Sequence, residues 1–128
     1  MASQLKVDTI TGVTTAGSIS VTGEGNSTTP NLQQSLVKVW AKFNGSSFGE
    51  LDSFNVSSFT DSGTGNYTVN INNDFSNANH ASIEGSGAYH TVNDAGNAVG
   101  TLNIACYNSS HSNADESRVA VHSCGDLA

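Results

Sequence analysis

The sequence predicts an all-β fold, an antiparallel, jelly-roll-like β-sandwich preceded by a β-ribbon anchor. Gly, Ser, Thr and Asn take the place of charged residues, which make up only 12% of the 128 residues. These side chains disfavour helices, because Ser, Thr and Asn compete for backbone hydrogen bonds and Gly costs entropy. Apolar residues alternate with polar ones in short runs, which is typical of half-buried strands. Gly- and Asn-rich turns separate the runs.

Residues 1–28 are predicted to form an attachment ribbon of two short strands and two glycine turns. Its apolar residues are too few to build a core. We expect three ribbons to wind together, or one ribbon to add as a strand to a neighbouring protein. The residues expected in this contact are Leu5, Val7, Ile10, Val13, Ile19 and Val21.

Residues 29–36 are predicted to form a short linker helix or turn. Thr29 is a suitable N-cap and Pro30 suits the first helical position. Leu32 and Leu36 lie four residues apart and would share one face of the helix. That face is expected to pack either against copies of itself around a symmetry axis or against the domain that follows.

Residues 37–128 are predicted to form the sandwich. Strands are expected in the runs 37–44, 52–59, 66–72, 80–85, 88–92, 99–108 and 117–125. The strands at 52–59 and 66–72 are expected to form a hairpin closed across residues 61–66. The residues expected to point into the core are Val39, Phe43, Phe54, Val56, Tyr67, Val69, Ile71, Ile83, Leu102, Ile104, Val119 and Val121.

The charge balance excludes several classes of partner. The net charge is −7 with only four Lys and Arg residues, so no cluster could neutralise a run of nucleic-acid phosphates. The same balance disfavours anionic membranes. No apolar run approaches the roughly 20 residues of a membrane span, and the N-terminus does not resemble a secretion signal. The sequence therefore predicts a protein made in a cytoplasm, with neither nucleic-acid binding nor membrane insertion.

The two cysteines are predicted to remain unpaired. Cys106 shares a strand face with Leu102 and Ile104, whereas Cys124 falls on the face opposite Val119 and Val121. If both strands belong to one sheet, the two sulfurs point to different sides, which disfavours a disulfide.

Catalytic and metal-binding patterns are weak, and we expect neither an enzyme nor a cofactor. The close carboxylate pairs Glu50–Asp52 and Asp115–Glu116 lie in predicted loops, where solvated acids are usual. A metal remains conceivable on a trimer axis through His122 or His90, and calcium remains conceivable at 70–74. The latter run has fewer carboxylates than a calcium loop needs.

Trp40 is the strongest candidate for surface recognition. It lies on the polar side of its predicted strand, between Lys38 and Lys42. An exposed Trp in this setting indicates either stacking on a ligand such as a sugar or packing between subunits. The second reading groups Trp40 with Leu32 and Leu36 as the expected trimer interface.

Three runs resemble a domain of tail-fibre-like and other virion proteins of marine bacteriophages. The similarity is close in "NLQQSLVKVWAKFNG" and "DSFNVSSFTDSGTGNYTVNI", returns at "NIACYNSS" and ends in "RVAVHSCGD". The opening "MASQLKVDTITG" also resembles the attachment segment of such proteins. The resemblance implies a homotrimeric β-structured appendage located in the virion, bound to another virion protein through its N-terminal segment.

The function expected from this resemblance is structural. The chain would be a short trimeric fibre that exposes its sandwich for contact with a host-surface glycan or protein. Capsid decoration and a carbohydrate-binding module are the alternatives.

Overall fold

A computed structural model describes residues 4–12, 19–22, 32, 36–87, 90–92 and 96–127, and of residues 90–92 it describes the backbone alone. The chain divides into two compact units, Met1–Ser35 and Leu36–Ala128. Each unit is described by itself below. The described residues form strands, turns and bends but no helix, so the all-β prediction is confirmed for them.

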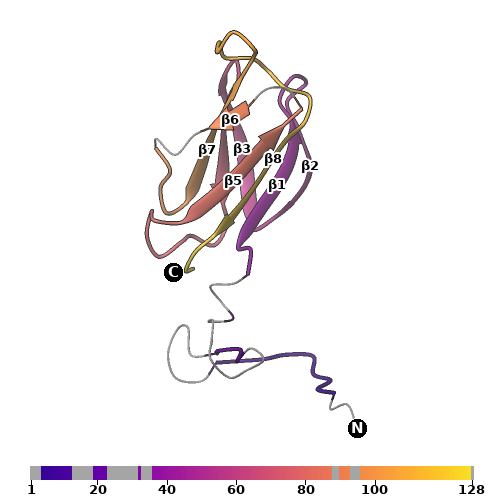
Figure 1. The fold of residues 1–128 in the computed structure, drawn as a ribbon, viewed down its shortest axis with the longest axis vertical. Coiled ribbons are helices and arrows are strands. Elements are labelled where there is room, and N and C mark those ends of the chain that lie inside the picture. Colours follow the sequence, from indigo (N-terminus) through magenta and orange to yellow (C-terminus); the bar gives the residue numbers. More distant parts are fainter. Residues whose placement is uncertain are drawn as a thin grey trace. The chain divides into compact units, whose positions relative to one another are not determined.

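The unit Leu36–Ala128 is built from antiparallel strands (Figure 1). Their bounds are β1 (Val39–Asn44), β2 (Gly49–Phe54), β3 (Val56–Gly63), β4 (Asn66–Ile71), β5 (Ala81–Ser86), β6 (His90–Val92), β7 (Thr101–Tyr107) and β8 (Val119–Cys124). The predicted hairpin is present, because β3 pairs with β4 across the turn after Gly63.

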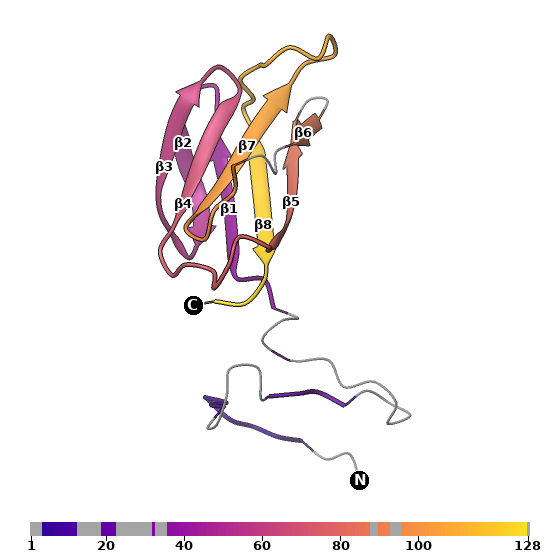
Figure 2. The ribbon, with the colours of Figure 1, turned by 90° about the vertical axis from the view of Figure 1, so that its left-hand side faces the viewer.

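The strands form two four-stranded sheets. The first sheet has the order β2-β1-β8-β5 and the second has the order β3-β4-β7-β6. Figure 2 shows the two sheets as separate layers. One cluster of buried side chains draws members from both sheets, so the layers share a core. Its members are Val39, Ala41, Phe43, Tyr67, Val69, Ile71, Phe75, Leu102, Ile104, Cys106, Val119 and Val121.

Strict alternation in the sequence explains the central strands. In β1, β4 and β8 every second side chain is buried and those between are exposed or half-buried. A period of two places alternate residues on opposite faces of a strand, so one apolar set turns to the core. Ten of the twelve residues predicted to point inward are buried or pack against the core. Phe54 and Ile83 are the two exceptions.

Phe54 faces outward because the chain changes sheets immediately after it. Asn55 lies between β2 and β3 with φ 59°, a left-handed conformation that Asn tolerates better than most residues. Its Nδ2 donates to the carbonyl oxygens of Lys38 and Asn73, each at 3.1 Å, and its Oδ1 accepts from the Asn73 amide at 2.8 Å. The run 52–59, predicted as one strand, is therefore two strands in different sheets. Val56 and Phe59, both after the corner, pack against the core.

Ile83 faces outward because β5 turns polar residues inward. It is 64% exposed, while Ser82 on the inner side donates to the buried Ser123 hydroxyl at 3.1 Å. Phe75 and Phe59 fill part of the core in its place. Phe75 is 1% exposed and Phe59 packs against the core, and neither was predicted to point inward.

Both cysteines are free, as predicted. Cys106 is buried on β7 beside Leu102 and Ile104, and Cys124 is half-buried on β8. The two strands belong to different sheets, so the premise that they share one sheet is wrong although the conclusion holds.

The unit Met1–Ser35 is described in part. Residues 4–12 form no strand, contrary to the predicted ribbon, and Ser20 makes a single β-bridge. Leu32 lies in a turn, where its amide donates to the Ile19 carbonyl at 2.8 Å. Leu36, at the end of the predicted helix, lies in a bend. The other residues of the predicted helix fall outside the described residues, as does Val13.

Candidate functional site

The outer face of the first sheet carries a row of large side chains. Cα pairing aligns Phe54 of β2 with Trp40 of β1, Trp40 with His122 of β8, and His122 with Ile83 of β5. Residues paired in this way point to the same side of a sheet. Phe54 is 54% exposed, Trp40 37% and Ile83 64%. These four residues, here called the apolar outer face, form a continuous band across all the strands of the first sheet.

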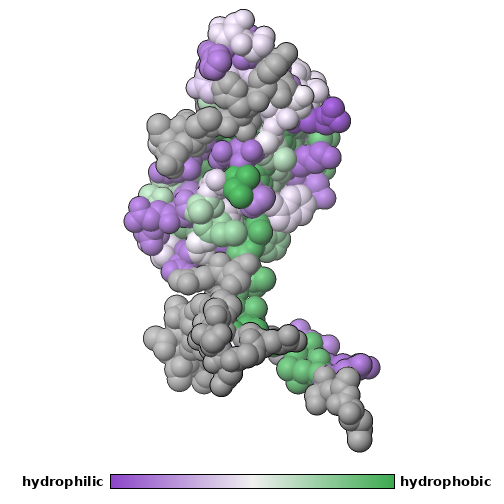
Figure 3. Space-filling model, viewed as in Figure 1, coloured by the Kyte–Doolittle hydropathy of each residue, from purple (hydrophilic) through white to green (hydrophobic). Residues whose placement is uncertain are grey.

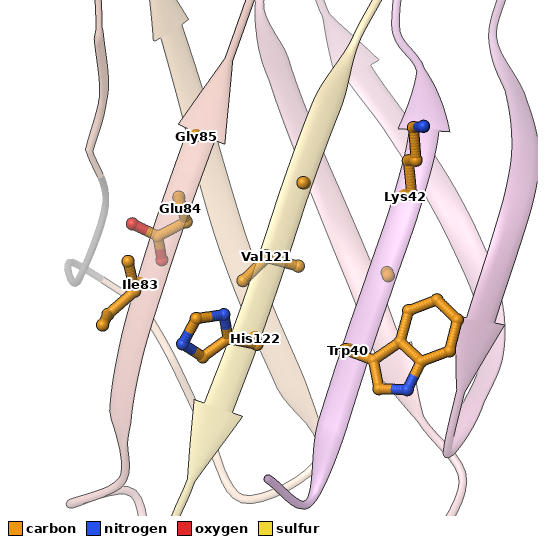
Figure 4. Close-up of a pocket in the computed structure, with 9 residues that line it drawn as sticks. Trp40, Lys42, Ile83, Glu84, Gly85, Val121 and His122 are labelled. Atoms are coloured by element: carbon orange, nitrogen blue, oxygen red, sulfur yellow. The ribbon is translucent and has the colours of Figure 1, made fainter.

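In the next row of the same face Ala120 and Gly85 are small, and this leaves a hollow. Lys42 pairs with Ala120, and Ala120 pairs with Gly85. A shallow hollow of about 420 Å³ lies between this row and the large residues Trp40, His122 and Ile83. Figure 4 shows the hollow from outside, with the broad face of the Trp40 indole turned toward the viewer. In Figure 3 hydrophobic residues lie over β5, β8 and β1 among hydrophilic ones.

Three charged residues lie in or beside the hollow. Lys42 of β1 is paired in register with Asp52 of β2, and both side chains are exposed. Asp52 lies on a strand, so its prediction as a loop residue, shared with Glu50, is wrong. Within the described part of the chain, no hydrogen bond or ion pair is seen for the Lys42 ammonium or the His122 ring. Glu84 of β5 also lines the hollow, so two acids and one base lie in or beside it, next to an aromatic surface.

The outer face of the second sheet is different in kind. Here Ser, Thr and Asn side chains hydrogen-bond to one another across neighbouring strands. Thr68 Oγ1 donates to Asn103 Oδ1 at 2.7 Å, and Asn70 Nδ2 donates to the hydroxyls of Ser58 at 3.0 Å and Thr60 at 3.2 Å. These five residues are called the polar outer face. They satisfy one another in a position open to water.

A second polar cluster lies inside the domain. The buried His80 ring stacks on Phe75 with centroids 4.3 Å apart, and its Nδ1 lies 3.1 Å from the Ser123 hydroxyl. Its Nε2 lies 3.3 Å from the Ala98 carbonyl oxygen. Ser123 is fully buried and also donates to the Ala81 carbonyl at 2.9 Å. A Ser–His pair enclosed in this way joins β5, β8 and the loop before β7, which is a structural role.

The predicted acid pair Asp115–Glu116 also has a structural role. Asp115 Oδ1 accepts from the Tyr67 hydroxyl at 3.0 Å and from the Gly65 amide at 2.7 Å. The Glu116 carbonyl accepts from the Gly45 amide at 2.8 Å. Burial raises the pKa of Tyr67, and the hydrogen bond to Asp115 raises it further. These contacts fasten the loop before β8 to the end of the core.

A G-x-S-x-G motif that sequence reasoning missed lies between β1 and β2. Residues 45–49 read GSSFG, which matches the G-x-S-x-G pattern of a hydrolase nucleophile turn. That pattern requires a strand-to-helix turn, but here it forms the turn between β1 and β2. The Ser47 amide donates to Asn44 Oδ1 at 3.0 Å, closing the turn. Phe48 is 37% exposed and stacks on Tyr67. The motif therefore forms and stabilises the turn of the β1–β2 hairpin.

The residues predicted to contact partners are mostly exposed where they are described. Exposures are 81% for Leu5, 52% for Val7, 57% for Ile10, 49% for Val21 and 53% for Leu36. Ile19 and Leu32 are half-buried, and Val13 lies outside the described residues. Their assembly into a trimer interface with Trp40 stays a prediction.

The described residues offer no arrangement of ligands at the positions considered for a metal site. Among the described residues no three His, Cys, Asp or Glu side chains gather as a metal-binding group. In the run 70–74, Asn70 is engaged by Ser58 and Thr60. His122 lies on the apolar outer face, and the side chain of His90 is outside the described residues.

The described residues include no helix long and apolar enough to cross a membrane. No protein-family profile matches this sequence, and comparisons with curated proteins and with solved structures gave no similar protein. The resemblance to bacteriophage virion proteins therefore stays a prediction.

Proposed function

We propose that this chain is a non-enzymatic structural protein of a bacteriophage particle, assembled as a short trimeric appendage. Residues 1–28 attach it to another virion protein, and residues 37–128 form a jelly-roll-like sandwich that faces outward for host contact. The resemblance of the sequence to virion proteins supports this role, as does the division into an N-terminal unit and a two-sheet domain.

The exposure of the N-terminal apolar residues carries the proposal. In the two-sheet domain large apolar residues such as Phe43 and Leu102 are fully buried. In the first unit Leu5 and Ile10 are more than half exposed. Burying apolar surface contributes about 25 cal/mol per Å². A segment that leaves such side chains in water gains stability when a partner covers them, as an attachment segment does.

Full-length variants with matched substitutions test the attachment. A variant with Leu5→Ser, Val7→Ser and Ile10→Ser removes the apolar contacts, and a control with Thr9→Ser and Thr11→Ser changes neighbouring polar positions. Circular dichroism should show the same β content for both. Copurification with phage particles should fail for the first variant and persist for the control.

Deleting residues 1–25 should give the same loss and leave a folded domain. Equal incorporation of the triple variant and the control would contradict the proposal. Immunolabelling of particles then distinguishes the two locations, since label on the tail fits a fibre and label over the head fits capsid decoration. Light scattering of the purified chain should give three times the monomer mass.

A further inference from the structure

We propose that the hollow beside Trp40 binds a neutral sugar of a host-surface glycan, with the indole stacking on the apolar face of the sugar ring. The inference rests on the proposed function, because the two-sheet domain must face outward to meet such a glycan. It assigns Trp40 to ligand stacking, one of the two roles that the sequence left open.

The contrast between the two outer faces shows that the first sheet is made to be covered. Ser, Thr and Asn side chains on the second sheet pair with one another in contact with water. The first sheet instead exposes Phe54, Trp40 and Ile83 in one row of paired residues that His122 completes. Exposed apolar groups gathered in this way mark binding surfaces.

The indole provides a platform of the required kind. Trp40 is 37% exposed, and the face of its ring is turned outward beside β1 (Figure 4). One side of a pyranose ring presents C–H groups, which pack on the electron-rich face of an aromatic ring. Such stacking requires an open, flat ring, and the hollow adjoins this ring on the side of β8 and β5.

The groups around the platform suit the hydroxyls of a sugar and do not favour an anion. Lys42 provides ammonium donors, the Asp52 carboxylate provides acceptors, and the His122 ring provides either role. Lys42 is paired in register with Asp52, and Glu84 also lines the hollow, so acids outnumber bases here. An anionic glycan would be disfavoured by this excess of acid, whereas a neutral sugar uses both donors and acceptors.

The size of the hollow suits a small ligand. Its volume of about 420 Å³ falls within the range of roughly 300–1,000 Å³ that is typical of ligand sites.

The floor of the hollow offers a way to close it without disturbing the core. Ala120 and Gly85 form the floor, and a Cβ placed on Gly85 meets no atom within 4 Å. The backbone of Gly85 does not require glycine, since its φ is not positive. Gly85→Val therefore fills the hollow while leaving Trp40 in place.

The test is binding of the full-length chain to a dense panel of neutral and acidic oligosaccharides. A trimer on a dense surface gains avidity, so weak single-site binding is detectable. We expect binding to neutral members, and about tenfold weaker binding for Trp40→Ala, the scale of one stacking contact. Gly85→Val should lose binding similarly. Thr68→Ala, on the polar outer face, should bind like the wild type.

Thermal melting of each variant establishes that the domain is folded. The proposal is overturned if no neutral sugar binds, if acidic members are preferred, or if Trp40→Ala binds as tightly as wild type. It is also overturned if light scattering shows that Trp40→Ala dissociates the oligomer, because a second copy then covers the face. Incorporation of Trp40→Ala into particles should be normal, so failure here is separable from failure of the proposed function.

Discussion

The two outer faces of this domain come from the same composition and have opposite characters. On the second sheet Thr68 donates a hydrogen bond to Asn103, and Asn70 donates one to Thr60. On the first sheet Trp40 and Ile83 stand beside a hollow with no such network between them. The difference shows that the exposure of side chains alone does not tell whether a surface is suited to a partner or to water. The first face is suited to a partner and the second to water.

The largest expected effect compares two isoleucines, one on each side of the sheets. Ile104 is 1% exposed in the core, whereas Ile83 is 64% exposed on the apolar outer face. Ile104→Ala should lower the free energy of unfolding by about 2–5 kcal/mol, because it leaves a cavity. Ile83→Ala should change it by no more than about 0.5 kcal/mol. Urea denaturation measures both, and equal losses would place Ile83 in the core.

The corner at Asn55 determines which way Phe54 faces, and it gives the next largest effect. Asn55→Ala removes the side-chain bonds to Lys38 and Asn73 and forces Ala into a left-handed conformation. The expected loss is about 3 kcal/mol, combining hydrogen bonds and backbone strain. Asn55→Gly loses the same side-chain hydrogen bonds but avoids the backbone strain, so it should lower the free energy of unfolding by less than Asn55→Ala. If both variants lose the same amount in urea denaturation, the conformation of residue 55 contributes nothing.

A smaller loss should follow from disrupting the polar outer face. Asn103 accepts from Thr68 Oγ1 at 2.7 Å and its Nδ2 donates to the Gly96 carbonyl at 2.6 Å. Asn103→Ala should therefore cost about 1 kcal/mol without changing sugar binding. Differential scanning calorimetry and the oligosaccharide panel measure the two effects. Loss of sugar binding in this variant would show that the two faces are not independent.

The last prediction concerns the pH dependence of stability in the alkaline range. It expects no change in the free energy of unfolding at neutral pH. Burial, together with the carboxylates of Glu116 and Asp115, raises the pKa of Cys106 from 9.0 to about 11. Because the folded pKa is the higher one, this contribution is complete below pH 9 and is lost as the pH rises toward 11. The urea midpoint should fall over that range, with the raised pKa of Tyr67 acting in the same direction.

Cys106→Ala should flatten the decline in the urea midpoint above pH 9, and an unchanged slope would exclude the thiol as its source. At pH 8 the half-buried Cys124 should be alkylated before Cys106, which mass spectrometry of the folded protein resolves. Faster alkylation of Cys106 would contradict its burial on the inner face of β7.

Regular alternation made most of the core predictable from the sequence. In β1, β4 and β8 the apolar set is unbroken, so Phe43, Val69 and Val121 were placed correctly. The prediction failed where a local change in the backbone alters which face of the strand points to the core. At Asn55 a left-handed residue carries the chain into the other sheet, and no pattern of hydrophobicity records that change.

The candidate site was predictable only in its centre. Trp40 stood out because a large aromatic residue occupied the polar side of its strand. Phe54 and Ile83 were assigned to the core because an apolar residue in a strand was taken to mark the inner face. Their alignment beside Trp40 depends on the pairing of β2 with β1 and of β5 with β8. Such pairings between distant segments follow from the whole fold and not from local spacing.

The most direct measurement uses the fluorescence of Trp40, because it is the single tryptophan of the chain. In the free protein we expect emission that acrylamide quenches readily and that does not change with protein concentration. A neutral oligosaccharide that binds should shift the emission to shorter wavelength and protect it from acrylamide. An indole shielded in the free protein and uncovered on dilution, or one unaffected by a bound sugar, would contradict this account of the apolar outer face.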